Sequence, residues 1–178
     1  MNNLNKIIVL CGSICSGKTY TANLISKETG FPVASFGGYL KHYCKLNNIP
    51  ITRKNLQDIG EHFVETRPKE FLDDVINYYV GESDTLIIEG VRHISIFHFI
   101  NKLAKNRITI YVEADQKTRY ERYINRIKES DDFITFDKFL LLDKHPVELE
   151  IQSLKTRCGV VIDSTKPVDE SLFKSFVL

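Results

Sequence analysis

The fold is decided by the stretch Ile7-Ile8-Val9-Leu10-Cys11-Gly12-Ser13-Ile14-Cys15-Ser16-Gly17-Lys18-Thr19. An apolar run passes here into a glycine-bounded loop that ends on a lysine and a threonine. Gly12, Gly17, Lys18 and Thr19 fit the G-x-x-x-x-G-K-[ST] pattern of a phosphate-binding loop. Glycines let backbone N–H groups turn inward around phosphate oxygens, and the following helix offers its positive end to the same group. The stretch therefore predicts a strand, a phosphate loop and a helix.

The helix expected after the loop covers residues 18–29, with Gly30 as its C-cap. In such a loop the lysine bridges the β- and γ-phosphates, and the threonine hydroxyl binds Mg²⁺. ATP and Mg²⁺ are thus the expected cofactors. The residues expected to bind ATP here are Gly12, Ser13, Ile14, Cys15, Ser16, Gly17, Lys18, Thr19 and Tyr20.

The composition indicates one ordinary globular domain over residues 1–178, long enough to bury a core and too short for two domains. Hydrophobic residues make up 43% and charged residues 26%, which disfavours disorder. The formal net charge is +1 and no long basic block occurs, so the sequence gives no electrostatic case for nucleic-acid binding. A small-molecule nucleotide is the expected partner.

The four cysteines lack paired C-x-x-C spacing and are interpreted as reduced thiols in a cytosolic protein. The first residues lead into only five apolar positions, which are too few for a signal peptide or a membrane span. We therefore expect a cytoplasmic protein without a membrane partner, either a monomer or a homodimer.

Strand-like and helix-like segments alternate along the chain. After the first strand, strands are expected at residues 31–36, 85–90, 107–113 and 159–163, and Gly37-Gly38 is expected to form a turn. After the first helix, helices are expected at residues 39–46, 53–65, 68–80, 95–104 and 116–128, within 133–143, and from about Val168. The alternation predicts an α/β fold with a five-stranded parallel sheet, helices on both faces, and ligands at the carboxyl ends of the strands.

Glu89 ends the third expected strand, at the sheet edge where the phosphate loop opens, and Arg92 lies on the loop that follows. A carboxylate at this edge can hold Mg²⁺ through water or orient the attacking group. Arg92 could clamp an acceptor phosphate. The alternatives are a carboxylate that faces solvent and a surface salt bridge.

The expected helix from Gln116 carries Arg119, Arg122 and Arg126 within a sector of about 60°. Three guanidinium groups in one stripe suit a phosphoryl group whose charge must be stabilised during transfer. The alternative is a solvated basic helix face. An insertion at about residues 128–145 follows, and its size suits a short helical lid that covers the nucleotides and excludes water.

A helical insertion at about residues 37–81 is expected to bind the acceptor. Aromatic side chains there could stack on a base, and basic side chains could meet a phosphate. The expected acceptor residues are Phe36, Gly37, Tyr39, Leu40, Lys41, Arg53, Arg67 and Arg92. For each aromatic residue the alternative is core packing. The five histidines show no ligand spacing and are interpreted as structural or surface residues, with His93 beside Arg92 the least certain.

Four segments together resemble the P-loop nucleoside-monophosphate kinase superfamily. They are the phosphate loop, Glu89-Gly90-Val91-Arg92, Thr118-Arg119-Tyr-Glu-Arg122-x-x-x-Arg126 and Val161-Ile-Asp-Ser-Thr165. A narrower resemblance, to small dephospho-CoA-kinase-like enzymes, is carried by Ser35-Phe36-Gly37 with Leu40, Arg53-x-Asn-Leu-Gln-Asp-Ile-Gly60, and Ser130-Asp-Asp with Thr135-Phe-x-x-Phe and Asp143. The resemblance implies a P-loop kinase fold, in which Ser164, Thr165, Lys166 and Pro167 border the adenine of ATP. It also implies that the arginines of the helix before the lid, Arg119, Arg122 and Arg126, contact the phosphates of ATP and of the acceptor.

Two departures from that resemblance concern the chemistry. Glu89-Gly90 stands where these families usually have Asp-Gly, so the acid is kept but reaches farther. True dephospho-CoA kinases resemble one another in placing an aspartate just after the second strand, where it accepts the proton of a sugar hydroxyl. This chain has Ser35-Phe36-Gly37-Gly38 there, and we expect no carboxylate nearby. An acceptor that is already a phosphate needs no such base, which favours a nucleoside monophosphate.

The interpretation is an ATP·Mg²⁺-dependent kinase that moves the γ-phosphoryl group in line to the phosphate of a ribo- or deoxynucleoside monophosphate. Its expected catalytic residues are Lys18, Glu89, Arg92, Arg119, Arg122 and Arg126, with Thr19 and Glu89 holding the metal, Glu89 through water. One rival is transfer to a hydroxyl, as in dephospho-CoA or a nucleoside. The other is a nucleotide-binding regulatory ATPase module. A GTPase is disfavoured because no Asn-Lys-x-Asp motif occurs.

Overall fold

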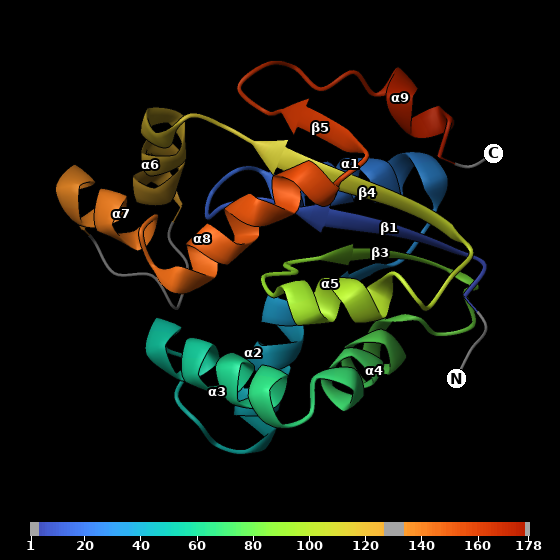
Figure 1. Cartoon of the computed structure of the whole chain (residues 1–178), viewed down its shortest axis with the longest axis horizontal. Coiled ribbons are helices and arrows are strands. Elements are labelled where there is room, and N and C mark those ends of the chain that lie inside the picture. The colour runs from blue at the N-terminus through green and yellow to red at the C-terminus, as the bar shows by residue number, and fades with distance from the viewer. Residues whose placement is uncertain (1–3, 127–133, 177–178) are drawn as a thin grey trace.

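A five-stranded parallel sheet in the order β2-β3-β1-β4-β5 forms the centre of the computed structural model, which describes residues 4–126 and 134–176 (Figure 1). The strands are β1 Lys6–Cys11, β2 Val33–Ser35, β3 Thr85–Glu89, β4 Asn106–Glu113 and β5 Val160–Asp163. Leu10 of β1 lies opposite Glu89 of β3 and Ile110 of β4. Because all the strands run parallel, the phosphate loop after β1 and Glu89 meet at one edge of the sheet.

Helices cover both faces of this sheet, which confirms the expected fold class. They are α1 Lys18–Thr29, α2 Phe36–Leu46, α3 Arg53–Thr66, α4 Pro68–Tyr79, α5 Ile94–Ile100, α6 Gln116–Asn125, α7 Phe136–Leu142, α8 Pro146–Ser153 and α9 Ser171–Lys174, with the 3₁₀ helix η1 at Leu154–Arg157. Side chains alternate along β1, so Ile7 and Val9 join the core cluster under α4, α5 and α8. Ile8 and Leu10 join the opposite cluster with α1 and α9. Burial on both faces explains the continuous apolar run of this strand.

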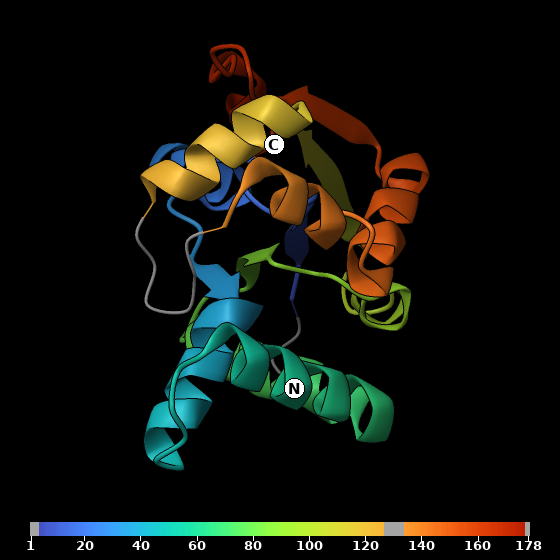
Figure 2. The same cartoon turned by 90° about the vertical axis from the view of Figure 1, so that its left-hand side faces the viewer.

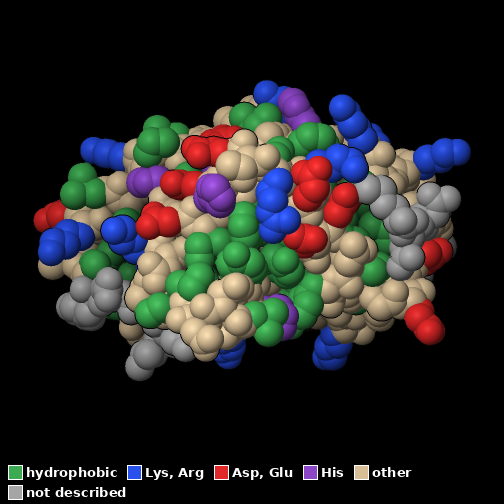
Figure 3. Space-filling model, turned by 90° about the horizontal axis from the view of Figure 1, so that it is seen from below, with side chains coloured by type: hydrophobic (Ala, Val, Ile, Leu, Met, Phe, Trp, Pro, Cys, Tyr) green, Lys and Arg blue, Asp and Glu red, His purple; other side chains and the backbone are tan. Residues whose placement is uncertain are grey.

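Helices α2, α3 and α4 form a layer beside the carboxyl ends of β2 and β3, and α6, α7 and α8 lie across from α2 and α3 (Figure 2). Aromatic rings hold the layer together, since Phe71 of α4 contacts Phe36 and Phe63 with ring centroids 5.2 and 5.1 Å apart. Figure 3 looks onto the face that α2, α3 and α4 form and shows hydrophobic side chains between charged ones. Leu46 of α2 and Tyr78 of α4 are exposed.

The expected turn at Gly37-Gly38 is wrong, because both glycines lie in the first turn of α2. This helix begins at Phe36, directly after β2, where residues 36–38 were expected to end a strand and turn. The Ser35 hydroxyl accepts a hydrogen bond from the Gly38 N–H at 3.1 Å and so caps the helix. A serine before the helix outweighs the turn tendency of two glycines here.

The bounds of helices α5, α6 and α9 also differ from the expected ones. Helix α5 ends at Ile100, whereas the expected helix continued to residue 104. After Asn101, the N–H groups of Lys102 and Leu103 donate to carbonyls three residues back, Phe99 and Ile100, as in a 3₁₀ turn. Helix α6 ends at Asn125, leaving Arg126 extended, and α9 begins at Ser171 rather than near Val168. Residues 127–133, which hold the expected helix end, the Glu129–Asp132 loop and Ser130-Asp-Asp, lie outside the described residues.

Helix α8 was not expected. It begins with Pro146 at its first position, where the missing N–H costs nothing, and the His145 ring accepts from the Val147 N–H at 3.4 Å. Of the expected lid, α7 is described and packs through Phe139 against Tyr123 and the phosphate-loop residues Ile14 and Cys15. None of the described helices has the length and apolar character needed to span a membrane.

Candidate active site

The phosphate loop between β1 and α1 has the backbone that its glycines allow. Gly12 and Gly17 have φ angles of +144° and +97°, and a Cβ at Gly12 would lie 2.2 Å from the Val112 carbonyl oxygen. Neither position therefore tolerates an L side chain without strain. The Ser16 hydroxyl is buried in this loop with no hydrogen-bond partner among the described residues. A buried hydroxyl of this kind fits a loop whose ligand supplies the missing partner.

Lys18 folds back over this loop, and its Nζ donates to the Ser13 carbonyl oxygen at 2.7 Å. Burial, followed by the positive charge of Arg92, lowers the pKa of Lys18 to about 8. The carboxylates of Glu148 and Glu89 act in the opposite direction. A negatively charged ligand in the loop would therefore stabilise the protonated lysine.

Three residues from different elements meet where β1, β2 and β3 end. The Thr19 hydroxyl donates to Glu89 Oε2 at 3.2 Å, and the Ser35 hydroxyl donates to Glu89 Oε1. Groups of three or more His, Cys, Asp or Glu side chains that could hold a metal do not occur within residues 4–126 and 134–176. One hydroxyl and one carboxylate leave most positions around Mg²⁺ to phosphate oxygens and water, which fits how this ion binds with nucleotides.

A cavity of about 460 Å³ runs from the loop to α2, α3 and the start of α8. Its polar lining near the loop includes Lys18, Thr19, Glu89, Arg92 and Glu148. Its far end combines apolar and polar side chains, among them Leu40, Leu56, Val64, Phe71, Gln57 and Glu61. This division gives the cavity a charged end for phosphate and a mostly apolar end for a larger group.

Most of the expected acceptor residues line this cavity. They are Phe36, Gly37, Leu40, Lys41, Arg53 and Arg92. Tyr39 instead packs against Phe71 and Tyr78, with ring centroids 6.0 and 5.9 Å away. Arg67 pairs with Asp74 at 3.0 Å and lies 4.3 Å over the Phe63 ring. Packing and ion pairing account for these two residues without an acceptor.

The three arginines expected on one stripe separate in the structure. Arg119 is 5% exposed and forms a two-pronged ion pair with Asp143 of the α7 C-cap, with NH1 to Oδ1 at 2.7 Å. Arg122 donates to the Ser164 hydroxyl and carbonyl oxygens at 2.8 and 2.6 Å. Arg126 follows the end of α6 and lines the cavity. Of the three, Arg126 is therefore the one placed beside the cavity.

The residues expected near adenine follow β5. Ser164 lies against the phosphate loop, because its hydroxyl donates to the Ser16 carbonyl oxygen at 2.6 Å. Thr165 turns back to Asp163, and Lys166 has a side chain that is 79% exposed. Tyr20 is also exposed, at 64%. Of these residues, Ser164 is therefore the one in contact with the phosphate loop.

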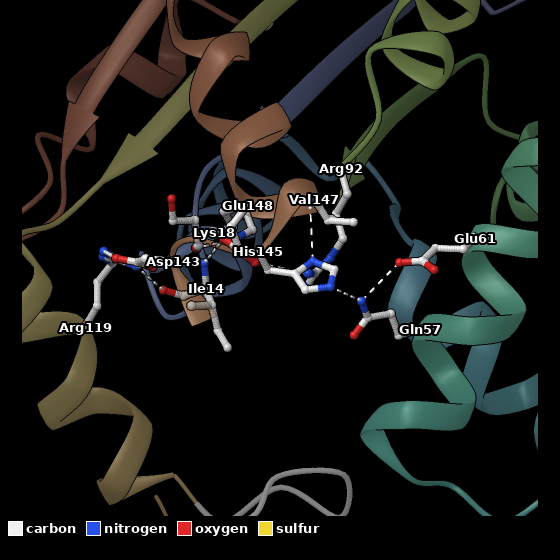
Figure 4. Close-up of polar contacts among 11 residues, drawn as sticks. Ile14, Lys18, Gln57, Glu61, Arg92, Arg119, Asp143, His145, Val147 and Glu148 are labelled. Carbon is white, nitrogen blue, oxygen red and sulfur yellow. Dashed lines mark hydrogen bonds and ion pairs between the residues drawn. The ribbon is translucent and has the colours of Figure 1, made fainter. Parts of the chain in front are cut away.

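The sequence interpretation missed Glu148 of α8, a buried carboxylate inside this cavity. Its Oε2 accepts from the Ile14 N–H at 3.1 Å and its Oε1 from Arg92 NH1 at 3.2 Å (Figure 4). The residue is 3% exposed. A proline followed by two acids is a signal for a helix start, and it could have revealed α8 but not its position.

His145 was interpreted as structural or surface, yet it lines the cavity next to α3. Its Nε2 lies 3.1 Å from Gln57 Nε2, and Gln57 donates to Glu61 Oε1 at 3.0 Å (Figure 4). These contacts join the start of α8 to α3 at the far end of the cavity. His93 is paired with Glu150 of α8 at 3.2 Å.

A protein-family model described as an AAA domain matches residues 8–135, which include the phosphate loop and Glu89. The chain belongs to this AAA domain family. A UPF0200 protein from Pyrobaculum aerophilum is 24% identical to this AAA domain protein over 165 residues, 92% of this chain and 91% of the relative. A cytidylate kinase from Thermoplasma acidophilum is 26% identical over 121 residues, which cover 67% of this chain and 60% of that kinase.

Solved structures show the fold of the AAA domain protein. A shikimate kinase from Bacteroides thetaiotaomicron superposes with a TM-score of 0.61 at 14% identity, covering 96% of this chain and 93% of that one. The chain thus has a P-loop kinase fold. Together with the family match and the cytidylate kinase relative, the fold confirms the resemblance to the P-loop nucleoside-monophosphate-kinase-like superfamily.

Proposed function

We propose that this protein is a kinase that transfers the γ-phosphoryl group of ATP to the phosphate of a ribo- or deoxynucleoside monophosphate. The observation that carries this proposal is the continuous cavity between the phosphate loop and α3, with Lys18 and Arg92 at its charged end. Its mostly apolar far end suits a nucleobase, while Lys41 and Arg53 add basic groups along its wall. The cytidylate kinase relative supports the same substrate class.

In this proposal the loop amides and Lys18 bind the phosphates of ATP, and Arg92 and Arg126 meet charge on the acceptor side. Thr19 would bind Mg²⁺ directly and Glu89 through water, and the metal supplies charge neutralisation when bound. Arg122 orders the loop from outside through Ser164, and Arg119 fixes α7 through Asp143. These two arginines act on the shape of the site rather than on a phosphate.

A specific observation favours a second candidate, transfer to a hydroxyl. The expectation that no carboxylate lies near the end of β2 is wrong. The Ser35 hydroxyl at the end of β2 donates to Glu89, and Glu148 lines the same cavity. Either carboxylate could accept a hydroxyl proton. A regulatory ATPase module remains the alternative of another class.

The test is an ATP-consumption screen with Mg²⁺ against ribo- and deoxynucleoside monophosphates, nucleosides and dephospho-CoA. Formation of a nucleoside diphosphate supports the proposal, whereas a new monoester supports the hydroxyl candidate. Lys18→Ala is the matched blank, and it should lose about a hundredfold to a thousandfold in turnover because it removes a positive charge that stabilises the transferred phosphoryl group. ATP binding without turnover of any acceptor would indicate the regulatory module.

A further inference from the structure

Glu148 is a negative group inside a site built for negative ligands. Its carboxylate is 3% exposed, and burying a carboxylate is costly unless hydrogen bonds and charge compensate it. Each of its oxygens accepts one hydrogen bond, from the Ile14 N–H at 3.1 Å and from Arg92 at 3.2 Å. The cavity therefore holds a seat with two converging donors that fits one planar or tetrahedral anion.

Both donors belong to groups that a phosphate would use. Ile14 lies within the phosphate loop, and its N–H is one of the backbone donors available to a nucleotide. Arg92 has a side chain that is 46% exposed and lines the cavity, so a ligand can reach its guanidinium group. Lys18 lines the same end of the cavity. A phosphate and the Glu148 carboxylate cannot occupy these donors together, because like charges at contact distance repel.

We propose that the Ile14 N–H and Arg92 form the seat of a substrate phosphate group, and that Glu148 is a positioning residue which competes with this phosphate for both donors. Binding of the phosphate transfers Arg92 from Glu148 to the substrate. Glu148 thereby keeps the two donors oriented and lowers their affinity for stray phosphate. The inference rests on the proposed function only in taking the ligand to be a nucleotide phosphate, either the γ-phosphate of ATP or the phosphate of the acceptor.

The test compares Glu148→Gln with Glu150→Gln, which removes the same charge from the same helix. Glu150 accepts from the Ile94 N–H at 2.6 Å and pairs with His93, so it is tied to the neighbouring loop and not to Ile14 or Arg92. Dissociation constants are measured by calorimetry for ADP, for a non-hydrolysable ATP analogue, and for inorganic phosphate in the presence of either nucleotide. None of these measurements needs turnover.

Glu148→Gln should bind at least one phosphate probe about tenfold more tightly, since the neutral amide removes the repulsion between a carboxylate and the phosphate. Tighter binding of the ATP analogue with unchanged ADP binding assigns the seat to the γ-phosphate. Tighter binding of inorganic phosphate beside the ATP analogue assigns it to the acceptor. Unchanged or weaker binding of every probe overturns the proposal, as does an equal gain in Glu150→Gln.

Glu148→Asp provides the second variant if the glutamine variant does not fold. It keeps the charge but shortens the side chain, so one carboxylate can no longer reach both donors, and a smaller gain in phosphate affinity is expected. Unchanged affinity in a folded Glu148→Asp overturns the proposal. If the wild type has no kinase activity but Glu148→Gln binds phosphate more tightly, the proposed function is refuted and this inference stands.

Discussion

Lys18 links the chemistry of the phosphate loop to the pH dependence of stability. Its pKa in the native protein is about 8, whereas an exposed lysine in the unfolded chain has about 10.4. Below about pH 8 both states hold the proton and burial penalises the native state. Between these two values the native state releases the proton first, so the free energy of unfolding rises with pH.

Replacing Lys18 by methionine isolates the contribution of its titration to the free energy of unfolding. The free energy of unfolding of the wild type, relative to Lys18→Met, should rise by about 1–2 kcal/mol between about pH 7 and about pH 9.5. Urea unfolding of both proteins at the two pH values measures it, and other titrating groups cancel in the difference. A difference that does not change with pH would contradict the lowered pKa of Lys18.

Arg119 and Asp143 form a buried ion pair whose partners depend on each other. Burial alone would raise the pKa of Asp143, but hydrogen bonds and charge from Arg119 outweigh it and hold the pKa below its usual value. Asp143→Asn should lower the free energy of unfolding by about 3–5 kcal/mol, because it leaves a buried guanidinium group without its counter-charge. Urea unfolding at neutral pH measures this loss.

The control is the double variant Arg119→Met with Asp143→Leu, which replaces the pair by apolar groups. It should recover most of the lost stability, since the cost lies in one unpaired charge. Because the native pKa of Asp143 is depressed, the wild type should also lose this stabilisation as pH falls through that value. Equal loss in the single and double variants would show that packing, not charge, holds α7.

At the scale of an element, the two glycines of α2 give a matched pair. A Cβ at Gly38 would lie 2.3 Å from the Tyr79 hydroxyl of α4, whereas a Cβ at Gly37 meets nothing within 4 Å. Gly37→Ala should raise the free energy of unfolding by up to about 1 kcal/mol, because alanine favours helix. Gly38→Ala should lower it by about 1–2 kcal/mol through overpacking.

A further variant identifies the contact responsible. Tyr79→Phe removes the hydroxyl that the new methyl group would strike, so it should restore the stability of Gly38→Ala. Thermal unfolding of the single and double variants measures the coupling. If Gly38→Ala is as stable as Gly37→Ala, then α2 and α4 shift apart at no cost and the packing argument fails.

At the scale of the whole molecule, the proposed nucleotide site joins elements that are far apart in the chain. The phosphate loop, α6 and the residue after β5 meet where Arg122 donates to Ser164 and Ser164 donates to Ser16. A non-hydrolysable ATP analogue at about 100 times its dissociation constant should stabilise the fold by about 2.7 kcal/mol, a shift of about 5–10 °C in Tm. At the analogue concentration used for the wild type, Lys18→Ala should show a smaller shift, and an equal shift would place the nucleotide elsewhere.

The sequence by itself determined the elements that local chemistry encodes. The glycines and Lys-Thr of the phosphate loop, the apolar run of β1 and the Gly30 cap fix the start of the chain, and α1 has the bounds expected for it. The parallel sheet followed from alternating strands and helices, since such strands need crossovers. Glu89 and Arg92 could be placed at the sheet edge because Glu89 ends a strand and Arg92 follows three residues later.

Only the tertiary structure decided which side chains meet at the site. Glu148 accepts a hydrogen bond from Ile14, 134 residues away in the chain, and Arg119 pairs with Asp143. No local pattern encodes such contacts, because a charged residue has the same helical spacing whether it faces a ligand, another charge or water. The chain's residue types set what chemistry is available, and packing between distant elements decides which groups are left to perform it.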